Sequence, residues 1–507
     1  MKVMRQQRAM LQTLFRRGRS AGGTSGIVKR HAQTSPAQRE GFGSFHSEDI
    51  ENLLRQGADQ YMPPEVHGVI SSSVLTPSLM ARLGEVEFGS KMCKELLFSL
   101  DPSWTFLNHG AFGAALKPLL LEAAAWRMHA EAQPLRFHDR QLLPLLALSV
   151  RSMAAHLGCA PTQLLPLPNV TSGLNAILAS LEPSLRRGDT LVCTTLTYGA
   201  TKKMLTALAL RTGATLVVLP LRLPLSAASA LADFQAQLVP HCLSSPRLVV
   251  IDSVTSNTAL SLPVTSIAQH IRRAYPTAGS SSPVIVVDAA HSLHSDPLLS
   301  LSPPSAGGEL HGGADFWLSN GHKWLCMPKG AAFCWLSERM RAWLRPAIVS
   351  HGFDLEGAPG ARLHSAFVWD GCRDYAAMLT APSALRIWSL LPPSHAYTAP
   401  LLHQATALLL DEWRTHGARL QAEDEGGETR HPAPPMSLIP LPAVVNGVST
   451  SGCTDVEAFR LQEWLHHVHR IEVPVKCIQG RLFVRLSAHI YNRLADYQHL
   501  AAAVRGE

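Results

Sequence analysis

The chain has 507 residues, of which 46% are hydrophobic and 16% charged, so it can bury large cores and is not a disordered protein. Its net charge is +7, but residues 1–40 sum to +8, which leaves −1 for the rest and argues against a nucleic-acid binder. No run reaches the ~18 uninterrupted apolar residues of a membrane span, because Arg211 interrupts the best candidate, 204–220.

The basic leader, residues 1–40, predicts a targeting segment. It has no acid before Glu40, is rich in Arg and Ser, and spaces its apolar residues so that an amphipathic helix can form. These features are typical of a mitochondrial or plastid transit peptide. We therefore expect a mitochondrial protein, with plastid and cytoplasm as alternatives. A plain disordered basic tail is the other interpretation of the segment.

The cysteines and one histidine run predict neither disulfides nor a metal site. Nine cysteines are an odd number and include no CxxC pair, which favours reduced thiols in a cell interior or organelle. The run His466, His467 and His469 lies on a predicted helix, and we assign it no thiol or carboxylate partner at ligand spacing. No metal is therefore expected.

From about residue 100 onward, β-rich runs alternate with helical stretches. Strands are predicted over 190–196, 215–221, 247–254, 283–290, 315–320 and 331–336. Helices between them are predicted over 174–185, 200–210 and 264–274. Continuous Val, Ile and Leu runs separated by helices are typical of a parallel sheet covered on both faces, whose ligands bind at the carboxyl ends of the strands.

The expected fold class is α/β, with a large domain on a mostly parallel sheet and a smaller α+β domain at the C-terminus. The predicted parts are the leader 1–40, an N-terminal segment 41–100 that packs against the small domain, the large domain 101–390 and the small domain 391–507. Three low-complexity stretches are predicted surface loops: 277–283, 302–313 and 422–435, the last being an insertion in the small domain.

Four features converge at the predicted carboxyl edge of the sheet. Lys323 follows a strand within the apolar stretch "FWLSNGHKWLCMPKGAAFCW". Asp288 closes a buried strand, where an acid is costly unless it pairs with a cation. Thr171 or Ser172 opens a helix in "NVTSGLNAIL", and the N–H groups at a helix start suit a phosphate. Tyr198 lies just beyond a strand end and is available for stacking.

One cofactor accounts for these four features together. Pyridoxal 5'-phosphate (PLP) has a ring nitrogen that favours a carboxylate, a phosphate that favours a helix start, and an aldehyde that forms an imine with a lysine. Each feature alone has an ordinary explanation, such as a helix cap or a core tyrosine. Their joint order along one α/β chain favours the cofactor.

Six stretches resemble the class V aminotransferase family of fold type I PLP enzymes, in the branch similar to isopenicillin N epimerase and L-cysteine desulfhydrase. They are "FLNHGAFG", "NVTSGLNAIL", "IDSVTSNTALSLPV", "VVDAAHS", "GADFWLSNGHKWLCMPKG" and "RLFVRLSAHIYN". The resemblance runs from about residue 100 to the end, and its Asn-x-His-Lys-Trp stretch is highly specific.

The resemblance implies a role for each matched residue around the cofactor. Lys323 would form the imine and move the Cα proton, Asp288 would pair with the ring nitrogen, and His291 would lie beside the ring near its phenolic oxygen. Tyr198 would stack on the ring. The other implied cofactor contacts are Thr171, Ser172 and His322 at the phosphate and Asn257 at a cofactor oxygen.

The substrate implied by the resemblance is a small amino acid. Arg485 would bind its carboxylate through two parallel hydrogen bonds, and Asn108 and His109 would line the entrance. A homodimer is implied as well. The sequence departs from the family at Gly371–Cys372, where the family often has a Gly-Thr pair, and Cys477 has almost no loop around it, which weakens a desulfurase interpretation.

The reaction favoured by the branch is β-elimination at a carbon–sulfur bond, as in L-cysteine desulfhydrases. Epimerisation, transamination and cysteine desulfuration within the same family are the alternatives. A non-catalytic protein that keeps the fold as a scaffold is the alternative of another class, and the presence of Lys323, Asp288, His322 and Arg485 argues against it.

Overall fold

A computed structural model describes residues 49–242, 244–276, 282–296, 299–301, 313–354, 358–420 and 434–507. The basic leader and most of the three low-complexity stretches lie outside the described residues. Within these ranges, no helix combines the length and the apolar character that crossing a membrane requires.

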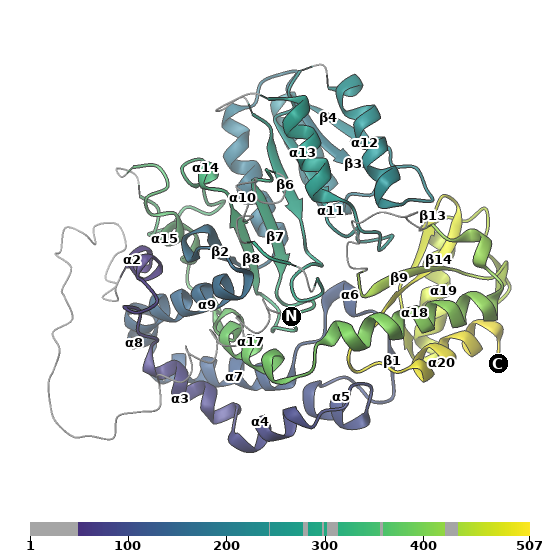
Figure 1. The fold of residues 1–507 in the computed structure, drawn as a ribbon, viewed down its shortest axis with the longest axis horizontal. Helices are drawn as coiled ribbons and strands as arrows, with labels where there is room; N and C mark the ends of the chain where they lie inside the picture. The colour runs from purple at the N-terminus through teal and green to yellow at the C-terminus, as the bar shows by residue number, and fades with distance from the viewer. Residues whose placement is uncertain are drawn as a thin grey trace, which may run out of the picture.

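A seven-stranded sheet forms the centre of the large domain (Figure 1), with the strand order β2-β8-β7-β6-β5-β3-β4. Its strands are β2 (Leu164–Leu167), β3 (Thr190–Thr194), β4 (Thr215–Leu219), β5 (Leu248–Asp252), β6 (Val284–Asp288), β7 (Phe316–Asn320) and β8 (Ala332–Leu336). Strands β3 to β7 pair in parallel, whereas β8 runs antiparallel to β7 and β2. The six predicted strands and the mostly parallel sheet are confirmed, and β2, a four-residue strand that contains Pro166, was missed.

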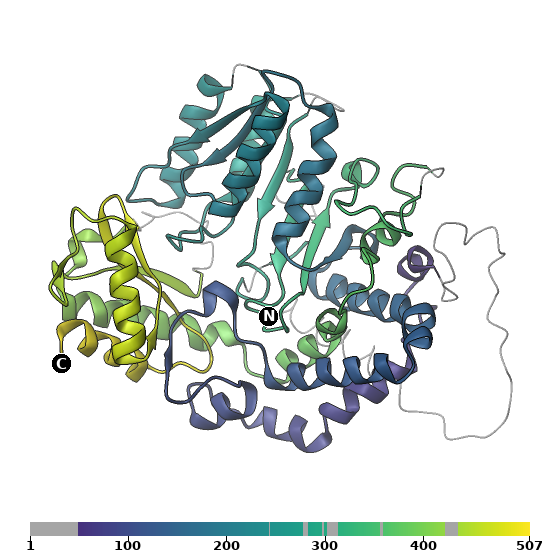
Figure 2. The same ribbon diagram turned by 180° about the vertical axis from the view of Figure 1, so that it is seen from behind.

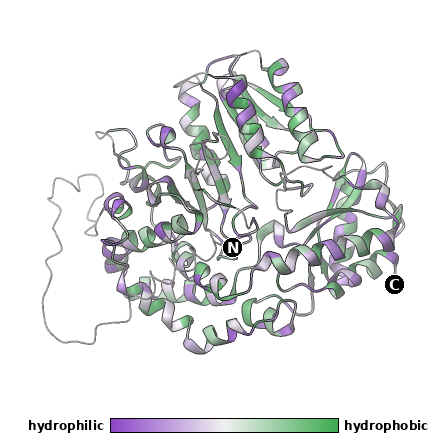
Figure 3. Ribbon diagram, viewed as in Figure 1, coloured by the Kyte–Doolittle hydropathy of each residue, from purple (hydrophilic) through white to green (hydrophobic). Residues whose placement is uncertain are grey.

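Helices cover both faces of this sheet (Figure 2). They include α9 (Leu142–Leu157), α10 (Val170–Leu181), α11 (Gly199–Thr212), α12 (Ala227–His241) and α13 (Val264–Ala274), while α7 (Lys117–Ala132) and α17 (Ala381–Leu390) pack on other helices, α17 on α9. Alternate residues of β6 enter opposite cores: Ile285 and Val287 pack in the cluster with α9, α12 and α13, and Val286 packs in the cluster with α10 and α11. Because the strands are apolar on both faces, they are mostly green in Figure 3, whereas the helices are mixed.

Shorter elements connect these parts. They are α6 (His109–Phe112), α8 (Pro134–Arg136), a π-helical turn (Phe137–Gln141), α14 (Glu338–Arg341), α15 (Leu363–Val368) and α16 (Ala376–Leu379). The 3₁₀ turns are Pro161–Gln163, Glu182–Ser184 and His416–Ala418.

The C-terminal part has its own hydrophobic core around an antiparallel sheet of order β13-β14-β9. Its elements are α18 (Ser394–Trp413), β9 (Met436–Pro440), β10 (Val444–Val445), β11 (Val448–Ser449), α19 (Asp455–His469), β12 (Ile471–Glu472), β13 (Val475–Ile478), β14 (Arg481–Ser487) and α20 (Leu494–Arg505). Strand β1 (Thr105–Phe106) pairs with β12, so the segment that leads into α6 is attached to this part of the chain.

The N-terminal helices are α2 (Ile50–Arg55), α3 (Glu65–Val74), α4 (Pro77–Gly84) and α5 (Lys91–Leu97). The prediction that this segment packs against the small domain is wrong for α2, α3 and α4, which contact α9, α7 and α17 of the large domain. The reason is apolar burial, since Ile50, Leu54 and Leu83 belong to the core cluster on that face of the large sheet. The end of α5 does approach the C-terminal part, where Cys93 donates to the carbonyl of Ile490.

Glu122 is a buried acid on α7 with few partners. Its Oε1 accepts a hydrogen bond from Nε1 of Trp126 over 3.4 Å, its Oε2 has no partner among the described residues, and Nε2 of His67 is 4.0 Å away. Burial raises the pKa of Glu122 to about 7 and lowers the pKa of His67 to about 4. Both groups are therefore uncharged at mildly acidic pH.

Replacing Glu122 with glutamine is expected to stabilise the protein only at higher pH. Unfolded Glu122 loses its proton near pH 4.5 and the folded group near pH 7, so its contribution to stability falls as the pH rises through this window. Glu122→Gln should raise the free energy of unfolding by about 3 kcal/mol above this window and leave it unchanged below. Urea unfolding on both sides measures this, with the exposed Glu95→Gln as control. An equal effect at both pH values would contradict the interpretation.

Candidate active site

Lys323 lies in the turn after β7, at the carboxyl edge of the sheet, and its amine contacts an imidazole. Its Nζ is 3.1 Å from Nε2 of His291, which lies in the turn after β6. The pKa of Lys323 falls to about 8, because burial and the charge of Arg485 outweigh the attraction of Asp288. The uncharged amine, the form that a nucleophilic lysine requires, therefore becomes accessible much closer to neutral pH than for an ordinary lysine.

The backbone around Lys323 is held by the segment of α6. Nε2 of His109 bonds to the carbonyl oxygen of Lys323 over 3.0 Å, and Nδ1 of His109 contacts the hydroxyl of Tyr491 at the same distance. Gly113 has φ +69°, and a Cβ there would collide with the backbone of His322 and Lys323. The sequence predicted His109 as part of the entrance, but in the structure it is fully buried beneath the lysine loop.

Two carboxylates end adjacent strands beside the lysine. Asp252 of β5 and Asp288 of β6 are register partners, and both are buried. The N–H of Ala290 donates to Asp288, and that of Tyr198 donates to Asp252. Burial raises the pKa of Asp288, and burial followed by the charge of Asp288 raises that of Asp252. A cation placed against Asp288 would offset the free-energy cost of burying its negative charge.

The N-cap of α10 is not the predicted residue, which was Thr171 or Ser172. Asn169 is the N-cap, and its side chain accepts from the N–H and the hydroxyl of Ser172, at 2.8 and 3.1 Å. Asn320, at the end of β7, accepts from the N–H of Val170 and so ties the helix start to the lysine strand. Thr171 is exposed on the first turn, where N–H groups have no partners within the helix.

His322 and Tyr198 flank the same edge. Nδ1 of His322 lies 3.2 Å from the carbonyl of Ala331, and burial lowers the pKa of His322 to about 4, which leaves a neutral ring. Tyr198 caps α11 and is 45% exposed, an unusual state for a tyrosine beside two buried acids. Its ring is available to a planar ligand.

Arg485 of β14 brings the C-terminal part into the site. It is 4% exposed, and it donates to the carbonyl of Ser256 and, over 3.1 Å, to Oδ1 of Asn108. Asn108 in turn donates to Glu472 over 3.1 Å. The Nε of Arg485 is buried without a partner in the described structure, and burial lowers the pKa of Arg485 to about 10. This guanidinium therefore retains an unused donor for an anion.

The structure also places Asn257, the implied contact to a cofactor oxygen, and the two cysteines that the sequence singled out. Asn257 is exposed in the turn after β5, and the carbonyl of its neighbour Ser256 accepts a hydrogen bond from Arg485. Cys372 is exposed. Cys477 lies within β13, opposite Leu482 of β14, and its thiol donates to a backbone carbonyl. It is thus on a paired strand and not on a loop.

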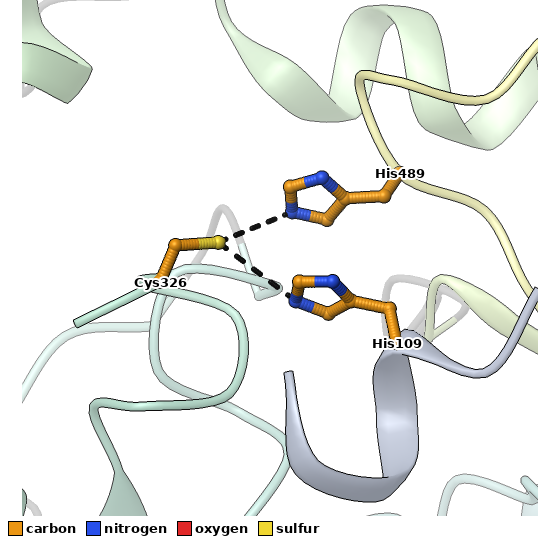
Figure 4. Close-up of side chains that lie close together, drawn as sticks. All are labelled: His109, Cys326 and His489. Atoms are coloured by element: carbon orange, nitrogen blue, oxygen red, sulfur yellow. Dashed lines mark hydrogen bonds between the residues drawn. The ribbon is translucent and has the colours of Figure 1, made fainter. Parts of the chain in front are cut away.

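Sequence reasoning missed a cluster beneath the lysine loop, formed by His109, Cys326 and His489 (Figure 4). The thiol is 3.4 Å from Nε2 of His489 and 3.8 Å from Nε2 of His109. The two rings stack at 3.9 Å with an interplanar angle of 13°, and the Nε2 atoms of both rings face the same thiol. Nε2 of His109 is also engaged by the carbonyl of Lys323. This arrangement fits a packed aromatic stack better than a tetrahedral zinc site.

The histidine run on α19 also differs from its prediction. His466 and His467 do have carboxylate partners, Glu472 at 3.1 Å and Glu463 at 3.2 Å. These are separate pairs on the rim of the C-terminal part, so the prediction that the run has no such partner is wrong.

The residues present fit PLP. Asp288 is a buried carboxylate that lacks a bonded cation, since the amine of Lys323 bonds to His291 instead. Tyr198 offers an exposed ring, Thr171 is exposed on the first turn of α10, and Lys323 offers an amine whose pKa is lowered to about 8. An acid, a stacking ring, an anion site and an amine are the donor set of this cofactor.

Fold and site together define a fold type I protein, the class of PLP-dependent enzymes. Residues 151–353 match the family model for Aminotransferase class-V, the family that the motifs resemble.

Two curated relatives fall in the predicted branch. An isopenicillin N epimerase of Amycolatopsis lactamdurans is 27% identical over 424 residues, which cover 80% of this chain and 96% of the relative. A probable chloroplastic L-cysteine desulfhydrase of Arabidopsis thaliana is 26% identical over 468 residues, 87% of this chain and 90% of the relative. Among solved structures, a complex of the cystine C-S lyase C-DES with cysteine persulfide has a TM-score of 0.60 at 19% identity and covers 80% of this chain and 97% of that chain. The last likeness shows the fold.

Proposed function

We propose that this protein binds PLP at Lys323 and cleaves the carbon–sulfur bond of a small amino acid such as L-cysteine by β-elimination. The observation that carries the proposal is the juxtaposition, at one sheet edge, of the amine of Lys323, the buried acid Asp288 and the buried guanidinium of Arg485. The names of the desulfhydrase relatives support the lyase over other outcomes.

When bound, PLP would withdraw electrons from the Cα of the substrate. Asp288 would hold the proton on the ring nitrogen, and Tyr198 would cover one ring face. Arg485 would orient the substrate carboxylate through its free donor. Lys323, once released, would take the Cα proton and later return a proton to the departing groups.

A persulfide-forming cysteine is not part of this proposal. Cys477, the one candidate that the sequence offered, is paired within β13 and its thiol bonds to the backbone. A direct elimination needs no such thiol: L-cysteine and water give sulfide, ammonia and pyruvate. Among the alternatives of the same family, epimerisation returns the proton to the other face of Cα, transamination needs a 2-oxo acid to accept the amino group, and desulfuration needs a thiol to accept the sulfur.

Incubating the purified enzyme with a panel of amino acids tests the proposal. Sulfide, pyruvate, alanine, D-isomers and new amino acids from an added 2-oxo acid are followed together. Sulfide with equal amounts of pyruvate from L-cysteine is expected, and it should survive Cys477→Ser. Three other outcomes would contradict the lyase. Alanine with protein-bound persulfide would indicate a desulfurase, racemised substrate an epimerase, and a new amino acid an aminotransferase.

Asp288→Asn is expected to keep PLP and lose most of the activity. The amine of Lys323 and the start of α10 are untouched, but an amide cannot hold a proton on the ring nitrogen. A partner carboxylate shifts such a pKa by about 1–3 units, so turnover should fall about 10- to 1000-fold. Steady-state kinetics of protein with confirmed PLP content measure this. Near wild-type turnover would show that Asp288 is not the partner of the ring.

We also propose a homodimer, because large apolar side chains are exposed on α6 and in the segment that follows α14. Phe112 of α6 is 76% exposed, and Ile348 and Val349 after β8 are 56% and 66% exposed. Light scattering coupled to size exclusion should give twice the mass of the chain, and a monomer at assay concentration would reject the proposal.

For localisation, we propose that residues 1–40 direct the protein to mitochondria, with plastids as the alternative. One relative is named chloroplastic, which supports an organelle. A reporter fused to these residues should enter the organelle, and the truncated enzyme should keep its activity. A cytosolic reporter would leave a plain basic tail.

A further inference from the structure

The residue after Lys323, Trp324, contacts the same histidine through its other ring nitrogen. The side chain of Trp324 is buried, and its Nε1 donates to Nδ1 of His291 over 3.3 Å. An indole N–H can only donate, so Nδ1 of His291 is the acceptor. The second ring nitrogen, Nε2, faces Nζ of Lys323 at 3.1 Å.

These two contacts fix where the imidazole proton lies. Burial, and then the charges of Lys323, Arg485 and His109, lower the pKa of His291 well below its usual value, so the ring is neutral and carries one proton. With Nδ1 accepting, that proton is on Nε2 and points at the amine of Lys323. An ammonium has no lone pair, so only the uncharged amine can accept this bond.

We propose that Trp324 is a positioning residue that locks His291 in the Nε2–H tautomer and thereby favours the uncharged amine of Lys323, the form that reacts with an aldehyde. The use of that amine rests on the proposed function, but the hydrogen bonds do not, since they exist without a cofactor. If the indole N–H were lost, His291 could carry its proton on Nδ1, and Nε2 would then accept from an ammonium.

Other charges that face the amine come from different elements and stay in place. Asp288 at the end of β6 favours the charged form of Lys323, and Arg485 on β14 disfavours it. A substitution confined to Trp324 leaves both unchanged, so a shift in the titration of Lys323 reports on His291.

The first test measures the titration of Lys323 in the full-length, cofactor-free protein. Trace acetylation with acetic anhydride over a pH series, read by mass spectrometry of the Lys323 peptide, gives its apparent pKa. Trp324→Phe should raise that pKa by about one unit. The matched control is Trp335→Phe on β8, whose indole N–H has no partner in the described structure, and which should change nothing. An unchanged pKa in Trp324→Phe would overturn the proposal.

A double substitution shows whether Trp324 acts through the histidine. In a His291→Phe background, adding Trp324→Phe should leave the pKa of Lys323 where the single variant put it. A further rise of the same size as in the wild-type background would mean that Trp324 acts on the lysine by another route, against the proposal.

A third measurement does not depend on whether a Trp324 variant folds. Nitrogen-15 NMR of the histidine-labelled protein, with His291 assigned by its absence from His291→Gln, should show a protonated Nε2 and an unprotonated Nδ1. The reverse tautomer would overturn the proposal. None of these measurements uses PLP or substrate. A failed sulfide assay would therefore not affect the proposal about Trp324, and a failure of that proposal would not affect the proposed lyase reaction.

Discussion

Replacing Lys323 with alanine is expected to reduce turnover by about 10³-fold or more, the larger part of what a positioned acid–base group supplies. The amine is the one nucleophile at the carboxyl edge that contacts a neutral imidazole, within the described part of the chain, and its pKa is lowered to about 8. No neighbouring side chain can take over both bonding to the cofactor and moving the Cα proton. Product formation from the preferred amino acid measures the loss.

The matched control for Lys323→Ala is Lys203→Ala, on the exposed face of α11. It removes an amine of the same type away from the sheet edge, so activity and visible absorbance should stay at wild-type values. Retained turnover in Lys323→Ala, with intact fold by circular dichroism, would remove this lysine from the chemistry.

Substituting Arg485 is expected to weaken substrate binding far more than cofactor binding. A hydrogen-bonded charge pair contributes about 1.5–3 kcal/mol, so Arg485→Lys, which loses the planar fork, should lower kcat/KM about 10- to 100-fold, mostly through KM. Arg485 is buried and bonded to Asn108, so its position is fixed before the substrate arrives.

The control for this variant lies on the same strand. Arg481, at the start of β14, is partly exposed, and Arg481→Lys should leave KM unchanged. PLP content, read from the visible spectrum, should be normal in both variants. An unchanged KM in Arg485→Lys would show that the substrate carboxylate binds elsewhere.

Much of the site could be predicted because its residues lie at the ends of helices and strands that the local sequence pattern identifies. Asp288 closes an unbroken apolar strand, and Lys323 follows another, so both had to meet at one sheet edge once the sheet was parallel. The cap of α10 was misplaced because Asn169 and Thr171 are both good cap residues, and the choice depends on the contact of Asn320 with Val170.

The contacts that were missed join segments far apart in the chain. Asp252 looked like an ordinary strand end until its register with Asp288 was known. Trp324 looked like one more apolar neighbour of the lysine, and only the fold shows that its N–H reaches His291. The N-terminal helices were misplaced for a related reason. Apolar residues such as Leu83 on an amphipathic helix predict that this face is buried, but not which domain it packs against.

The most direct test of the central claim is to identify the covalent bond between cofactor and protein. The purified protein, incubated with PLP, should show a visible absorbance band. After reduction with borohydride and proteolysis, mass spectrometry should find the phosphopyridoxyl group on Lys323 and the band should be absent in Lys323→Ala. A colourless protein that takes up no PLP, or a label fixed on another lysine, would contradict the account.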